Sequence, residues 1–121
     1  MNRTPEEAAL ILAVLFQRSG EKRARISEKT LKLIGYRERL KAAFIVNVTE
    51  ALADYHDLCL IQISNGFGII PNKSLEAAKA ITAKKILTKE ELDSLRNGED
   101  LDFESLRREI ENKDEFMDDS D

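Results

Sequence analysis

The stretch ISEKTLKLIGYRERLKAAFIVNVTEALADYHDLCLIQISNGFGII, residues 26–70, decides the fold. Ser27 is a good helix cap, and the short helix that it opens is expected to stop at Gly35-Tyr36. A longer helix is expected to start near Arg37, with its apolar side chains spaced along one face: Leu40, Phe44, Val48, Leu52 and Tyr55. Lys and Arg crowd the first turns of this helix, where they oppose the helix dipole. An anionic partner bound at that end would explain them.

The second half of the stretch predicts a β-hairpin. Two runs rich in aliphatic residues, 58–64 and 67–71, flank Asn65-Gly66. Asn-Gly between such runs is the strongest short hairpin signal, because both central residues of the tight turn need positive φ. We therefore expect two antiparallel strands joined at this dipeptide.

The segment before the stretch predicts one helix and a connector. Thr4 can cap a helix whose first residue is Pro5, and Glu7 completes a capping box. The helix should end at Ser19-Gly20 and bury a stripe of apolar residues: Ala8, Ile11, Leu12, Leu15 and Phe16. The polar and basic segment 21–26 should be an exposed connector.

Further helices are expected after the hairpin. The first should run through Leu75, Ala78 and Ile81, and a capping box at residues 88–91 should open another that ends at Asn97-Gly98. A last helix is expected from Phe103 to Asn112. Residues 113–121 carry five acids and one base, so we expect a disordered acidic tail. The predicted organisation is a domain over 1–81, a helical extension over 82–112 and this tail.

This order of elements resembles the winged helix-turn-helix group over residues 5–81. The fold class expected is thus mainly α with a small antiparallel β-hairpin. The resemblance implies that the helix after the tight turn enters the major groove of duplex DNA and that the hairpin, or wing, rests on the DNA backbone or minor groove. At the matching positions it implies DNA contacts by seven residues: Lys29, Lys32, Tyr36, Arg37, Arg39, Lys41 and Asn65. The wing, residues 63–70, contains no Lys or Arg, so salt-dependent affinity would have to come from the helices and residues 22–29.

The charge is divided unevenly along the chain. Residues 1–41 hold ten Lys and Arg against five acids, whereas residues 42–121 hold nine against eighteen. A polyanion responds to the local field of a patch and not to the average charge. We therefore expect a small DNA-binding protein, a transcriptional or mobile-element regulator. The alternatives are a protein-docking winged-helix module, an acidic inhibitor or antitoxin-like protein, and a basic face that is simply solvated.

The carboxyl-terminal part allows two further expectations. Residues 99–121 hold eleven acids and three bases. The acidic tail could fold over Arg37 and Arg39 and compete with DNA, dock a basic partner, or only increase solubility. The apolar residues between Leu75 and Ile110 exceed what an appendage needs to cover its own surface, which favours a homodimer through this region.

Enzymatic chemistry finds little support in the sequence. His56 is the only histidine and Cys59 the only cysteine, and no nucleotide-binding, zinc-binding or redox motif is present. We expect no catalytic residue, no cofactor and no metal. No stretch reaches the roughly 20 apolar residues of a membrane span. The acidic pair Glu6-Glu7 near the start argues against a signal peptide, so the expected location is cytoplasmic.

Overall fold

The computed structural model describes the backbone of residues 1–116 and the side chains of residues 1–112. The chain divides into two compact units, Met1–Ala78 and Lys79–Asp121. Both units are mainly helical, and the sheet lies in the first. A mainly α chain with a small antiparallel sheet was the predicted class, and it is confirmed.

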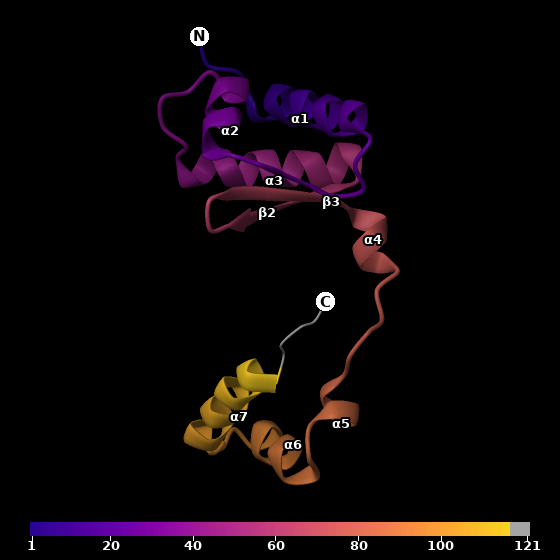
Figure 1. Ribbon diagram of the computed structural model, residues 1–121, viewed down its shortest axis with the longest axis vertical. Helices are drawn as coiled ribbons and strands as arrows, with labels where there is room; N and C mark the ends of the chain where they lie inside the picture. Colours follow the sequence, from indigo (N-terminus) through magenta and orange to yellow (C-terminus); the bar gives the residue numbers. More distant parts are fainter. Residues whose placement is uncertain (117–121) are drawn as a thin grey trace. The chain divides into compact units, whose positions relative to one another are not determined.

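The first unit contains four helices and three strands among its described residues (Figure 1): α1 (Pro5–Ser19), β1 (Ala24–Ile26), α2 (Glu28–Gly35), α3 (Ala42–His56), β2 (Leu58–Ile63), β3 (Gly66–Pro71) and α4 (Asn72–Glu76). The strands form one antiparallel sheet in the order β1-β3-β2. In Figure 1, α3 lies between the sheet and α1. The predicted hairpin is therefore part of a three-stranded sheet.

β1 corrects the prediction that residues 21–26 are only an exposed connector. Ala24 is in register with Ile69, and Ile26 is in register with Phe67. Two half-buried apolar residues flank the exposed Arg25, which is the alternation of a strand covered on one face. Three residues are too few for this pattern to stand out in the sequence.

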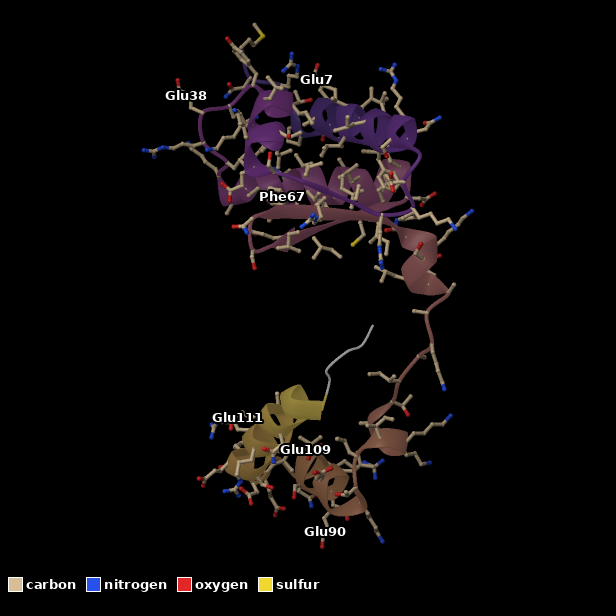
Figure 2. All side chains as sticks on the ribbon, in the orientation of Figure 1. Glu7, Glu38, Phe67, Glu90, Glu109 and Glu111 are labelled. Carbon is tan, nitrogen blue, oxygen red and sulfur yellow. The ribbon has the colours of Figure 1, made fainter. Side chains whose placement is uncertain are left out.

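One apolar core joins α1, α2, α3 and the sheet. Phe67 is its largest fully buried side chain and lies between α3 and the sheet (Figure 2). The predicted stripe of α3 is confirmed for Phe44, Val48 and Leu52, whereas Tyr55, near the end of the helix, is 71% exposed. The core residues are Ala8, Ala9, Leu12, Leu31, Ile34, Phe44, Val48, Ala51, Leu52, Leu58, Leu60, Phe67 and Ile69.

The start of α1 is as predicted, and its buried face is as predicted for Ala8, Leu12 and the partly buried Phe16. The Thr4 hydroxyl accepts a hydrogen bond from the Glu7 N–H, and the Glu7 carboxylate accepts one from the Thr4 N–H. Ala8 and Leu12 are fully buried. Ile11 and Leu15 were expected in the core and are exposed, because the core contact is centred on a different side of the helix, which includes Ala9.

The hairpin turn differs by one residue from the prediction. Ile63 pairs with Gly66, so the central residues of the turn are Ser64 and Asn65. Among the described residues other than glycine, only Tyr36 and Asp57 have positive φ, so the expected positive φ of Asn65 is wrong. Gly66 has a φ of 148°, and a Cβ there would collide with the carbonyl oxygen of Ile26. The glycine is needed because β1 lies so close to the hairpin.

The second unit consists of short helices: α5 (Ala83–Ile86), α6 (Lys89–Arg96) and α7 (Phe103–Phe116). α6 opens with the predicted capping box between Thr88 and Glu91. α7 starts where expected and runs to Phe116, four residues beyond the predicted end. The helix expected through Ile81 is wrong, because α4 ends at Glu76. Residues 117–121, the rest of the predicted tail, lie outside the described residues.

Candidate nucleic-acid interface

α2 and the turn after it form the first part of the candidate site. The helix begins as predicted, with the Ser27 hydroxyl accepting the Thr30 N–H at 3.1 Å. It ends when the Tyr36 N–H donates to the Leu33 carbonyl and the Arg37 N–H donates to the Lys32 carbonyl. Tyr36 takes the left-handed conformation, with φ of 53°, and its side chain is 60% exposed. The predicted tight turn therefore presents an aromatic ring to solvent.

Arg37 does not open the following helix, which corrects its predicted position. Its backbone N–H already closes α2, and its guanidinium carbon lies 3.8 Å from the centroid of the Phe44 ring. One guanidinium nitrogen, Nη2, donates to the carbonyl of Arg3 at 2.8 Å. Arg3 in turn donates to the carbonyls of Ile34 and Gly35. Arg37 thus fastens the amino-terminal segment to the end of α2.

α3 begins at Ala42, so residues 37–41 form a loop. Leu40 packs against the core, while Arg39 and Lys41 are exposed in this loop and not on the helix. Lys41 is the N-cap and makes no side-chain hydrogen bond to the helix, and the first turn contains no acidic residue. The first N–H groups of a helix have no partner within the helix and favour an anion.

The outer face of α3 is small and uncharged near its start and acidic towards its end. Seven residues of α3 are exposed with no cation among them: Ala42, Ala43, Val46, Asn47, Glu50, Asp54 and Tyr55. Asn47 is the polar group in the first half of this face, and it was missed by the sequence analysis. Because the helix was expected to start near Arg37, its DNA contacts were predicted at residues 36–41 and not at this position.

Four of the seven predicted residues line one hollow of about 830 Å³. They are Lys29 and Lys32 from α2, Tyr36 from the turn, and Arg37. Leu33 lies between them in the sequence, lines the same hollow and is 72% exposed. The structure therefore brings these predicted residues together. Arg39 and Lys41 do not line this hollow.

Asn65, the seventh predicted residue, is exposed at the hairpin turn. It lines a second hollow, of about 480 Å³, with Arg25 of β1 and the Ser27 cap of α2. Arg25 therefore supplies a cation beside the turn that the hairpin itself lacks. From the sequence alone, Arg25 belongs only to a basic segment, because the pairing of β1 with β3 was not predicted.

Positive charge is concentrated in one segment of the first unit. Residues 22–41 contain eight Lys and Arg and two Glu, and six of the eight cations are exposed. The whole of Met1–Ala78 holds eleven Lys and Arg against nine acids, so the rest of the unit is net acidic. Eight of the eleven cations of this unit therefore belong to residues 22–41.

The described residues also bear on metal and membrane chemistry. In the part of the chain that the structure describes, no group of three or more His, Cys, Asp and Glu could hold a metal ion. His56 ends α3, with its ring edge-on to that of Tyr55, and Cys59 is half-buried. Within residues 1–116, no helix combines the length and the apolar character that a bilayer crossing requires.

Comparisons of the chain with protein-family models, with curated proteins and with solved structures found no match.

Proposed function

We propose that the chain binds duplex DNA and acts as a transcriptional or mobile-element regulator. The binding surface, termed here the cation surface, would consist of Lys29, Lys32, Tyr36, Arg39 and Lys41. The observation that carries the proposal is the concentration of eight cations and two acids in residues 22–41. Such a patch attracts phosphates through its local field, although the whole chain has a net charge of −4.

The arrangement of elements supports a winged helix-turn-helix reading of the first unit. The order of α2, a tight turn, α3 and the hairpin of β2 and β3 matches that of a helix-turn-helix followed by a wing. In this reading α3 is the recognition helix and the turn at Ser64-Asn65 is the tip of the wing. Arg25 and Asn65 would contact the DNA backbone beside it.

The start of α3 is the part of that helix best suited to DNA. Its free N–H groups and the neighbouring Lys41 would bind a phosphate, while the small side chains of Ala42 and Ala43 permit close approach. Asn47 would face base edges, where an amide can pair with adenine in the major groove. Glu50 and Asp54 would repel phosphates, so the duplex would meet only the first half of the helix.

The test is binding of a fluorescently labelled duplex of mixed sequence, followed by anisotropy over a range of salt concentrations. Replacing Lys29 and Lys32 with Gln should weaken binding about tenfold at low salt and reduce the salt slope by about 2, because two phosphate contacts are lost. The matched control replaces Lys73 and Lys79 with Gln; both lie outside residues 22–41, and the change removes the same charge. Equal losses in the two double variants, or no binding by the wild type, would refute the proposal.

A protein partner with an acidic and apolar surface is the second candidate. It is favoured by Leu33, which is 72% exposed in the same hollow as Lys29 and Lys32. Replacing Leu33 with Ala removes apolar surface without changing charge. This variant should bind DNA as the wild type does, whereas a partner that packs on Leu33 would lose affinity. If Leu33→Ala lost as much DNA affinity as the double variant of Lys29 and Lys32, an apolar contact at Leu33 would explain binding better than phosphate contacts by the lysines.

A further inference from the structure

α1 is apolar on every side, which is unusual for a helix at the surface of a domain. Its ten central residues, 8–17, carry no charge. One side faces the core through Ala8, Ala9 and Leu12, which are fully buried. Outside this side, Leu10, Ile11 and Leu15 are 54%, 37% and 43% exposed, and Val14 is half-buried. A surface helix normally has a polar outer face, and one that is apolar all round is covered on both sides.

The outer face of α1 has a regular pattern of charge. With a rotation of about 100° per residue, Glu7, Leu10, Val14 and Arg18 fall on the side away from the core. Ile11 and Leu15 lie on the flank between these residues and the buried Ala8 and Leu12. The four apolar residues 10, 11, 14 and 15 are centred midway between Leu12 and Ala13. Glu7 and Arg18 lie at equal distances from this midpoint, one at each end, and both are exposed. The outer face, residues 7, 10, 11, 14, 15 and 18, is therefore an apolar patch with one acid and one base at opposite ends.

We propose that this outer face binds the same face of a second copy of the chain, with the two α1 helices antiparallel across a two-fold axis. A two-fold interface uses the same patch on both subunits. The axis would pass level with the midpoint between Leu12 and Ala13. Ile11 would then lie level with Val14 of the partner subunit, and Glu7 would lie level with Arg18 of the partner subunit.

The charges favour this occupant and this orientation. Antiparallel pairing joins opposite charges at both ends of the interface, whereas parallel pairing would place Glu7 beside Glu7 of the partner subunit. In the capping box, Oε1 of Glu7 accepts the Thr4 N–H at 2.9 Å, which leaves the other carboxylate oxygen for a partner's guanidinium. The acid at one end and the base at the other make this face complementary to a second copy of itself. This self-complementarity favours a second copy over an unrelated partner.

This inference does not depend on DNA binding. All residues of the cation surface lie in the segment 29–41, and none of them belongs to α1. The dimer would therefore carry two copies of the cation surface and leave both free. A single pair of helices gives an interface below the standard size of about 1,600 Å², so dissociation in the micromolar range is expected.

The first experiment is sedimentation equilibrium of the full chain, without DNA, from low to high micromolar concentration. The wild type should form dimers, and Leu10→Glu or Val14→Glu should raise the dissociation constant at least about tenfold by placing a carboxylate in the apolar patch. Leu33→Glu is the matched control, because it adds the same charge at an exposed leucine on α2. Circular dichroism would verify that each variant is folded.

The second experiment tests the orientation by disulfide formation in a Cys59→Ser background. In the antiparallel dimer the two copies of residue 18 are about 16 Å apart along the helices, which is beyond the reach of a disulfide. Arg18→Cys alone should remain unlinked, while a mixture of Arg18→Cys and Glu7→Cys should form a cross-linked dimer. Cross-linking of Arg18→Cys with itself would overturn the antiparallel arrangement.

Two further results would overturn the proposal as a whole. One is a wild type that stays monomeric at high micromolar concentration. The other is a dimer that survives Leu10→Glu and Val14→Glu but dissociates with Ile110→Glu. That result would locate the interface in the carboxyl-terminal part of the chain, where the apolar residues between Leu75 and Ile110 were predicted to pair.

Discussion

Arg37 holds two segments together around the ring of Phe44. Its guanidinium lies 3.8 Å from the ring centroid and donates to the Arg3 carbonyl. A Cβ on Gly35 would lie 2.8 Å from the Phe44 ring, so the ring can occupy this position only because residue 35 has no side chain. Arg37→Ala should lower the free energy of unfolding by about 1–3 kcal/mol through the lost cation–π contact and hydrogen bond. Urea denaturation would measure the change.

Two variants control for this prediction. Arg37→Lys should not restore stability, because an ammonium cannot stack flat on the ring while it donates to the carbonyl. Arg39→Ala, two residues along the same loop and exposed, should change stability by no more than about 0.5 kcal/mol. If Arg37→Ala had the stability of the wild type, Arg37 would instead be free to contact a partner.

Tyr36 combines a left-handed backbone conformation with an exposed side chain. A left-handed conformation costs a residue with a side chain roughly 1–2 kcal/mol, and glycine is the usual choice at this position after a helix. Tyr36→Gly should therefore raise the free energy of unfolding by about 0.5–1 kcal/mol, part of the gain being lost to the greater freedom of the unfolded chain. If Tyr36 contacts DNA, the same variant should weaken binding. Chemical denaturation and duplex anisotropy would measure the two effects.

The matched control for Tyr36 is Tyr55, which is 71% exposed at the far end of α3. Tyr55→Ala should leave DNA affinity unchanged. A variant Tyr36→Gly that gained stability and kept full DNA affinity would remove Tyr36 from the cation surface.

At the scale of elements, the close approach of β1 to the hairpin depends on Gly66. A Cβ at this position would collide with the Ile26 carbonyl, and its φ of 148° is unfavourable for any other residue. Gly66→Ala should therefore lower the free energy of unfolding by more than about 2 kcal/mol. Gly68 is the control in the same strand, because a Cβ there would come no closer than 3.9 Å to other atoms. Gly68→Ala should change stability by less than about 1 kcal/mol, and equal effects would argue against the close approach.

At the scale of the whole molecule, the two units should differ in local stability. All core residues belong to Met1–Ala78, and among residues 79–112 none is buried. Helices without a buried face cannot offset the conformational entropy of ordering. Hydrogen exchange should therefore be slow for amides of α3 and β3 and fast for amides of α6 and α7. Equal protection of α7 and α3 would mean that α7 is covered by a partner.

Local patterns in the sequence predicted most helix boundaries. Thr4 with Glu7 and Thr88 with Glu91 are capping boxes in both the sequence and the structure. The cap of α2 at Ser27 is likewise confirmed. These interactions span three residues, so the amino acids involved are sufficient to specify them.

The sequence by itself also determined the class of the fold and the segment that carries the cations. What only the tertiary structure decided depends on contacts between residues far apart in the chain. β1 exists because β3 offers it an edge, and Gly66 is required by Ile26, forty residues before it. Arg37 is held by Arg3 and Phe44, and the exposure of Ile11 and Leu15 depends on which side of α1 meets the core. Helical periodicity predicts that a face is apolar. The packing of the other elements decides which apolar face is buried and which remains exposed to a partner.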